Sequence, residues 1–149
     1  MAEDGFDPQI LIPLDLDLAR GSRSRIGRIL LVDDDPVVRE LTTSVLKRAG
    51  HAVVAVERAS AALREIEVDH EGFDLLITDL VMPGITGLEL ANRVRLSRPQ
   101  MPILFISWYS EELVDNAADV RPFLAKPYSA DSLLATVGSL LRRAVPAQN

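Results

Sequence analysis

The chain has 149 residues, which fits one domain and leaves little room for a second. Its net charge of −6 argues against nucleic acid as the main partner, because binding to a phosphate backbone needs a basic surface. The sequence has no cysteine, which excludes disulfides, and no apolar stretch approaches the roughly 20 residues of a membrane span. We therefore expect a cytoplasmic protein without a nucleic-acid or membrane partner.

The first 27 residues differ from the rest of the chain. Residues 10–18 alternate apolar and acidic side chains around Pro13, and the polar run 20–25 is typical of a linker. We predict a flexible tail over residues 1–27, a domain over 28–143 and a second tail over 144–149. In a second interpretation, the alternating leucines dock on a partner or on the domain itself; these are Leu11, Leu14, Leu16 and Leu18.

From Arg28 onward, short apolar runs alternate with helical periodicities. The apolar runs predict strands at 29–32, 52–56, 73–78, 102–106 and 123–125. Apolar residues at helical spacing predict helices from Pro36 to a stop at Gly50, around 59–66, over 88–94, weakly over 110–118, and after an N-cap at Ser129. This alternation predicts an α/β fold, a doubly wound parallel sheet of five strands with helices on both faces.

Residues suited to phosphate chemistry follow four of the predicted strands. They are Asp33, Asp34 and Asp35 after the first strand, Asp79 after the third, Ser107 after the fourth and Lys126 after the fifth. The carboxyl ends of parallel strands share one edge of the sheet, where ligands bind. Clustered carboxylates suit Mg²⁺, and a carboxylate nucleophile can accept a phosphoryl group. A solvated acidic turn would explain the three aspartates alone, but not the other strand ends.

The segments 31–36, 78–84 with Gly87, Ser107 and 126–128 resemble the receiver domain of two-component response regulators. The resemblance covers about residues 28–143, and it is strongest to hybrid-kinase and stand-alone receivers with a short fourth helix. It implies a flavodoxin-like sheet with strand order 2-1-3-4-5. It also implies a partner that presents a phosphohistidine, either a histidine kinase or a histidine phosphotransfer domain.

The same resemblance implies roles for the acidic residues. Asp79 is the expected phosphoacceptor. Asp34 and Asp79 would bind Mg²⁺ directly, together with the backbone carbonyl of Val81, and Asp33 would act through a bound water.

The resemblance also implies roles for residues on the last two strands. Lys126 would pair with the phosphoryl group, and Ser107 would donate a hydrogen bond to it. Phe123 matches the aromatic switch position, and the bond between Lys126 and Pro127 would be cis. We expect a phosphorelay acceptor rather than a turnover enzyme, acting as a single-domain regulator through protein contacts, as a monomer or weak homodimer.

Four further residues with titratable side chains are expected outside this chemistry. Asp74 and the two histidines, His51 and His70, are predicted to lie at the surface. Asp35 is predicted to be a solvated neighbour of the metal site.

Three features depart from the family pattern. Trp108 replaces the small residue that usually follows Ser107, and its indole either packs outward or partly covers the site. Ser107 and Lys126 are separated by 19 positions (126 − 107), so the fourth helix should be stunted. Val81 and Tyr109 flank the phosphoryl position without a carboxylate or amide to orient water, which predicts slow self-dephosphorylation.

Two other functions compete with this interpretation. Residues 33–37 also fit the first motif of haloacid-dehalogenase-like phosphatases, in which Asp33 would be the nucleophile. That family needs a further acidic pair on a later strand, and only Asp131 follows Lys126. A pseudo-receiver that binds partners without phosphorylation is suggested by Trp108 and the short fourth helix.

Overall fold

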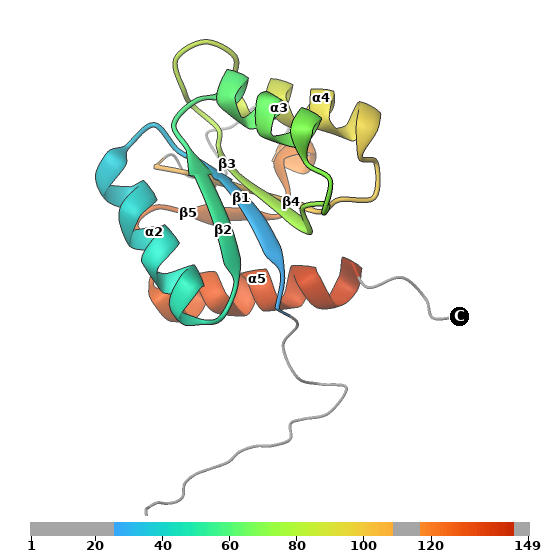
Figure 1. Ribbon diagram of the computed structural model, residues 1–149. Coiled ribbons are helices and arrows are strands. Elements are labelled where there is room, and N and C mark those ends of the chain that lie inside the picture. The colour runs from blue at the N-terminus through green and yellow to red at the C-terminus, as the bar shows by residue number, and fades with distance from the viewer. Residues whose placement is uncertain (1–25, 109–116, 145–149) are drawn as a thin grey trace, which may run out of the picture.

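The computed structural model describes residues 26–108 and 117–144, which form a parallel sheet covered by helices on both faces (Figure 1). The strands are β1 (Arg28–Val32), β2 (Ala52–Val56), β3 (Leu75–Asp79), β4 (Ile103–Ser107) and β5 (Phe123–Ala125). All pair in parallel, in the order β2-β1-β3-β4-β5. This confirms the predicted α/β class and strand order.

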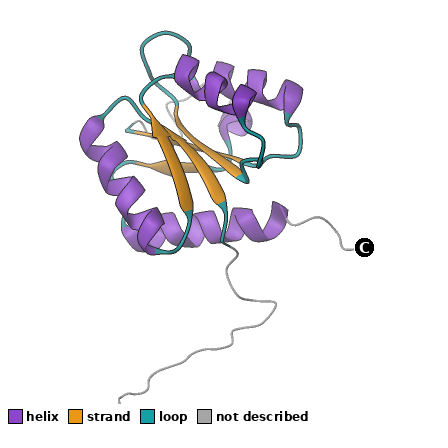
Figure 2. Cartoon of the chain, in the orientation of Figure 1, coloured by secondary structure: helices purple, strands orange, loops and turns teal. Residues whose placement is uncertain are grey.

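The described helices are α2 (Pro36–Arg48), α3 (Ala59–Val68), α4 (Gly87–Ser97) and α5 (Ala130–Ala144), with a 3-10 segment η3 (Ala117–Val120). Figures 1 and 2 show α2 and α5 on one face of the sheet and α3 and α4 on the other. The predicted helix over 110–118 falls almost entirely outside the described residues. Both predicted tails fall outside them as well, apart from Ile26, Gly27 and Ala144.

Local signals in the sequence position the helices. Pro36 opens α2, and Asp35 Oδ1 accepts hydrogen bonds from the backbone amides of Val37 and Val38 at 3.0 and 3.3 Å. Asp35 is therefore an N-cap, a role that comes in addition to its predicted place beside the metal site. Past the other end of α2, Gly50 has a φ of +104°, a left-handed conformation that favours glycine. Ser129 Oγ accepts from the Ser132 amide at 3.0 Å, as predicted for an N-cap.

The core consists of two apolar layers, one on each face of the sheet. Strands β1, β3 and β4 are buried on both faces, as their continuous apolar runs predict. Phe105 belongs to the layer under α3 and α4, and Leu104 to the layer under α2 and α5. The central strands are thus held rigidly, and their carboxyl ends are fixed with them.

Truncation of this core should be costly. We expect Leu104→Ala to lower the free energy of unfolding by about 2–5 kcal/mol, because the side chain is completely buried in the layer under α2 and α5 and its removal leaves a cavity there. Leu96 on α4 is 86% exposed, and Leu96→Ala should change stability by less than about 0.5 kcal/mol. Urea denaturation of both variants measures the difference. Equal losses would contradict this description of the core.

At the amino ends of the strands, one surface prediction is wrong and a second is only partly met. His51 is buried, and its Nδ1 accepts a hydrogen bond from the Gly27 amide at 3.0 Å; burial lowers the pKa of its imidazole. Asp74 is half-buried, and its Oδ2 accepts from the Arg28 amide at 2.8 Å. Both side chains bond backbone groups that precede or begin β1, a long-range pairing without a local signal. His70 is exposed, as predicted.

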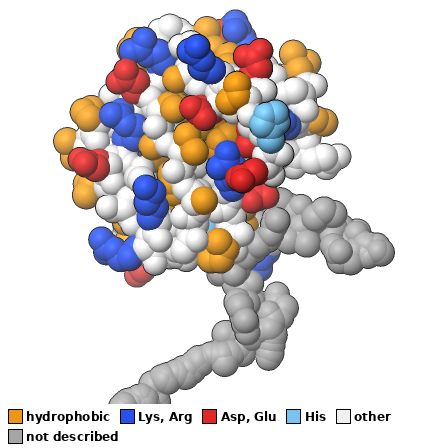
Figure 3. Space-filling model, in the orientation of Figure 1, with side chains coloured by type: hydrophobic (Ala, Val, Ile, Leu, Met, Phe, Trp, Pro, Cys, Tyr) orange, Lys and Arg blue, Asp and Glu red, His pale blue; other side chains and the backbone are white. Residues whose placement is uncertain are grey.

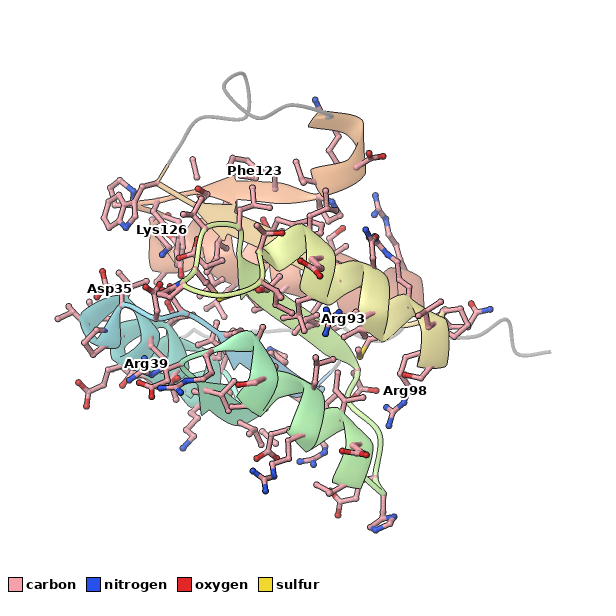
Figure 4. All side chains as sticks on the ribbon, turned by 90° about the horizontal axis from the view of Figure 1, so that it is seen from above. Asp35, Arg39, Arg93, Arg98, Phe123 and Lys126 are labelled. Carbon is pink, nitrogen blue, oxygen red and sulfur yellow. The ribbon has the colours of Figure 1, made fainter. Side chains whose placement is uncertain are left out.

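A cluster of charged side chains around Asp69 lies at the same end of the sheet. Asp69 Oδ1 lies 2.9 Å from Arg28 Nη2, and Asp69 Oδ2 lies 3.6 Å from Arg98 Nη1. The Arg28 guanidinium also stacks 4.4 Å from the centroid of the Phe73 ring. Figure 4 shows Arg98 where α4 ends, close to the end of α3. The cluster therefore joins the α3–β3 connection to β1 and α4.

This cluster predicts acid-sensitive stability. Burial raises the pKa of Asp69, but hydrogen bonds from Arg28 and backbone amides outweigh it and hold the pKa below its usual 3.8. A depressed carboxyl pKa stabilises the fold above the unfolded value, and this contribution is lost as the pH falls below about 3.8. Asp69→Asn should therefore be less stable than wild type in urea at pH 7, and the difference should shrink toward pH 3. A constant difference would contradict the ion-pair explanation.

Candidate functional site

Four strand ends bring the candidate residues together. Asp33 follows β1, Asp79 ends β3, Ser107 ends β4 and Lys126 follows β5. All four side chains are buried, with between 0% and 5% of each residue exposed. The strand register is responsible, because Val32 pairs with Thr78 and Ser107 with Ala125. The predicted grouping of these residues at one edge is confirmed.

A buried ammonium bridges two carboxylates at the centre of the site. Lys126 Nζ lies 2.8 Å from Asp33 Oδ2 and 2.9 Å from Asp79 Oδ2. In Figure 4, Lys126 lies at the same end of the sheet as the loop that carries Asp35. Because burial of unpaired charge is strongly unfavourable, the ammonium and the two carboxylates are stabilised by these contacts. The Lys126–Pro127 bond is cis, as the family resemblance implies.

The donor set fits a hard divalent cation. Asp33, Asp34 and Asp79 each offer a carboxylate oxygen, and these oxygens lie within 4.8 Å of one another. Asp34 is exposed whereas the other two are buried, so the set opens to water on one side. Asp33 Oδ2 is buried and, besides the nearby ammonium, has no well-directed hydrogen bond within the described part of the chain. Oxygen ligands that keep water access are what Mg²⁺ requires.

The electrostatics agree with this fit. Burial raises the pKa of Asp79, the negative charge of Asp33 raises it further, and the contacts with Lys126 only partly offset these effects. For Lys126, burial lowers the pKa, but its bonds to Asp33 and Asp79 outweigh this and keep the pKa raised, so the ammonium stays charged. One more positive charge beside Asp79 would favour its ionised form.

The other residues predicted for the site lie around this centre. Ser107 accepts a hydrogen bond at its backbone oxygen from the Lys126 amide at 2.7 Å. Phe123 is half-buried on β5 (Figure 4). It pairs in register with Phe105 of β4. Val81 is 56% exposed at the rim, and its amide donates to Asp79 Oδ1 at 3.3 Å. Tyr109 lies outside the described residues.

The position of Trp108 combines the two predicted arrangements, in which its indole either packs outward or partly covers the site. The side chain is 55% exposed, so it is largely in solvent. Its ring centroid nevertheless lies 5.6 Å from Lys126 Nζ, within the range of a cation–π contact. The indole therefore stands at the rim of the site against the central ammonium.

The structure adds two positioning residues that the sequence analysis gave no role. Arg39 Nη1 donates to the backbone oxygen of Asp33 at 2.8 Å, and Figure 4 shows Arg39 on α2 below the site. Gly87 begins α4 so close to β3 that a Cβ there would collide with the Asp79 carbonyl oxygen. The sequence signal for the contact of Arg39 with Asp33 was the position of Arg39, one turn into α2. The signal for the close approach of Gly87 to Asp79 was their spacing in the sequence.

Together, the doubly wound sheet and a carboxylate cluster bridged by lysine define the receiver class of α/β signalling domains. A sequence profile described as "Response regulator receiver domain" matches residues 29–138. The chain therefore belongs to the response regulator receiver domain family of two-component signal transduction, as the motifs indicated.

Curated relatives agree with this assignment. Response regulator protein FleR of Pseudomonas aeruginosa is 37% identical over 114 residues, which are 72% of this chain and 23% of FleR. Response regulator MprA of Mycolicibacterium vanbaalenii is 34% identical over 122 residues, 80% of this chain and 52% of MprA. The chain thus spans about half or less of the length of these relatives.

Two solved structures match the fold along almost their whole length. The response regulator protein TrrA of Thermotoga maritima, crystallised in complex with Mg²⁺ and BeF, is 32% identical with a TM-score of 0.69. The receiver domain of the hybrid histidine kinase CckA is also 32% identical, with a TM-score of 0.66. Each alignment covers 77% of this chain and 99% of the other. In the described parts of this chain, no helix has the length and apolarity needed to cross a bilayer.

Proposed function

We propose that Asp79 accepts a phosphoryl group from a phosphohistidine of a histidine kinase or histidine phosphotransfer domain, in a Mg²⁺-dependent reaction. The observation that carries this proposal is the buried Lys126 ammonium, shared between Asp33 and Asp79 beside a three-carboxylate set. Phosphoryl transfer needs positioned charges more than covalent machinery, and this arrangement supplies them.

The transfer follows from the positions of these groups. An Asp79 carboxylate oxygen attacks phosphorus, the bond from phosphorus to the imidazole nitrogen breaks, and the imidazole leaves with the bonding electron pair. Lys126 is then released from Asp79 to pair with a phosphoryl oxygen while it keeps Asp33. The ammonium thereby offsets part of the negative charge of the new phosphoryl group without moving far.

Residues at the rim complete the proposed site. Asp34 and Asp79, with the Val81 carbonyl, would bind Mg²⁺ directly, and Asp33 would act through a water. Bound there, Mg²⁺ would neutralise the phosphoryl oxygens during transfer. Ser107 would donate a hydrogen bond to the attached phosphoryl group, and Phe123 would respond to that bond as the switch. We propose that the signal then passes by contact with another protein.

Trp108 offers a direct test, since it is the only tryptophan and contacts Lys126. Its fluorescence should change on titration with Mg²⁺ and again when beryllofluoride is added to the Mg²⁺-loaded protein. Asp79→Ala should abolish the second response. A beryllofluoride response that survives in this variant would contradict the phosphoacceptor assignment, and a wild-type protein without any response would favour a pseudo-receiver.

The rim also predicts a long-lived phosphoryl group. Val81 is exposed beside Asp79, and neither Val81 nor Tyr109 offers a carboxylate or amide to orient an attacking water. We expect Val81→Asn and Tyr109→Glu each to speed the loss of phosphate, measured by decay of the labelled protein after the donor is removed. Asn92→Asp, an exposed change on α4, serves as a control that should leave the rate unchanged. Wild-type decay as fast as either rim variant would overturn the prediction.

The phosphatase alternative has less support. A nucleophilic Asp33 would leave its paired position beside Lys126 and would leave the β3 motif around Asp79 without a role. Among the described residues, the one candidate metal-binding acidic group is that of Asp33, Asp34 and Asp79, with no further acidic pair near β5. Steady release of phosphate from simple esters would favour the phosphatase, whereas labelling that stops at one group per chain would favour the acceptor.

A further inference from the structure

The outer edge of β2 has no strand beside it in the described part of the chain. Within the described residues, β2 pairs only with β1, and Figure 1 shows it at the front edge of the sheet. The strand reads Ala-Val-Val-Ala-Val, without a charge, a proline or a bulge. Such an edge pairs readily with another strand unless something covers it. Figure 3 shows hydrophobic side chains scattered among charged ones on this side of the molecule, with no continuous charged band.

Two backbone positions of β2 face this edge. The Ala52 amide donates to the Gly27 oxygen, and the Val56 oxygen accepts from the Asp33 amide, so both residues point toward β1. Backbone groups alternate in direction along a strand. The amides and carbonyls of Val53 and Ala55 therefore point away from β1.

One flank of α2 leaves an apolar ridge beside the same edge. Thr42 Oγ1 bonds the Tyr128 hydroxyl at 2.6 Å, and Leu46 is buried in the layer shared with α5, so these two residues mark the side of α2 that faces α5. Leu41 directly precedes Thr42, and Val45 directly precedes Leu46. Each is therefore rotated by about 100° around the helix axis, to the flank of α2 that faces away from α5. Leu41 is 63% exposed there, and α2 packs on β2.

The chain that precedes β1 leaves the domain next to this edge. A Cβ at Gly50 would lie 2.9 Å from Ile26 Cδ1, so the Ile26 side chain lies on the turn that leads into β2. Eight residue steps separate Leu18 from Ile26 and can reach about 27 Å when extended. A strand placed outside β2 needs a shift of only two strand spacings from β1, about 10 Å.

We propose that residues 14–18 add to the free edge of β2 as an antiparallel sixth strand. The segment Leu-Asp-Leu-Asp-Leu has the period of a strand with one buried face and the same length as β2. Its leucines lie on the face of Val53 and Ala55, against the ridge of Leu41 and Val45. Pro13, which cannot donate to a ladder, falls outside the paired run. An antiparallel edge strand on a parallel sheet is a common arrangement.

Amide hydrogen exchange in the full chain tests this proposal. The Val53 and Ala55 amides should exchange as slowly as that of Val54, and Leu16→Pro should speed the exchange of both by at least about tenfold while leaving Val54 protected. Leu11→Pro, outside the paired run, should have no effect. Leu41→Ser should speed the exchange of the same two amides without touching the segment itself.

Two results would overturn the proposal. One is rapid exchange of Val53 and Ala55 in the unaltered chain, which would leave the edge open. The other is protection that survives Leu16→Pro and grows with protein concentration, which would make a second copy of the chain the occupant of the edge. Phosphorylation of Asp79 is not involved in any of these measurements.

Discussion

Asp79→Asn should remove phosphorylation completely and leave the fold intact. Wild-type protein incubated with Mg²⁺ and a phosphohistidine donor is expected to take up as much as one phosphoryl group per chain. The variant is expected to take up none, because a carboxamide is not a competent nucleophile for this transfer. Intact-mass measurement counts the phosphoryl groups directly.

The stability of this variant makes the result interpretable. The pKa of Asp79 is raised by burial and by the neighbouring charge of Asp33, so ionised Asp79 is less favourable in the fold than in the unfolded chain. A neutral amide should therefore be tolerated, while Lys126 keeps Asp33 as its partner. Asp131→Asn, an exposed change in the first turn of α5, is the matched control and should be labelled like wild type. If Asp79→Asn were labelled to the wild-type level, the phosphoacceptor would have to be another residue.

Lys126→Met should have the largest effect on stability among changes at the site. It removes the ammonium from between two buried carboxylates, which leaves their charges uncompensated. Breaking a buried ion pair in this way typically lowers stability by about 3–5 kcal/mol. We expect a loss of this size in urea denaturation without Mg²⁺, and phosphorylation should be impaired as well.

Mg²⁺ should partly restore Lys126→Met, and this distinguishes an electrostatic effect from lost packing. The variant has lost a positive charge next to the carboxylates, so it should bind the cation more tightly and gain more stability from a given concentration than wild type does. Lys47→Met, at the exposed end of α2, is the control and should change neither stability nor the Mg²⁺ effect by much. Equal stabilisation of Lys126→Met and wild type by Mg²⁺ would contradict the proposed position of the cation.

The sheet and the centre of the site could be predicted because both depend on local order in the chain. Four apolar runs ending at Asp33, Asp79, Ser107 and Lys126 specify parallel strands, and parallel strands bring their carboxyl ends to one edge. Some observed strand boundaries differ from the predicted ones by one or two residues, because pairing with neighbouring strands decides where a strand begins and ends. Phe73 packs in the core ahead of β3, and Asp79 and Ser107 are themselves the last residues of their strands.

Contacts between distant segments could not be predicted in the same way. The hydrogen bond from Gly27 to His51 and the stacking of Arg28 on Phe73 depend on how segments far apart in sequence meet. The position of Trp108 depends on packing against Lys126, for which its own segment carries no signal. Such residues look like surface residues when they are considered one at a time.

The shared ammonium also sets the charge balance of the site. Asp33, Asp34 and Asp79 carry three negative charges and Lys126 carries one positive charge, which leaves two negative charges. A single divalent cation makes the cluster neutral, whereas a monovalent ion leaves it anionic and a trivalent ion makes it cationic. By Coulomb's law the site therefore attracts a divalent cation more strongly than a monovalent one, before size or coordination geometry acts.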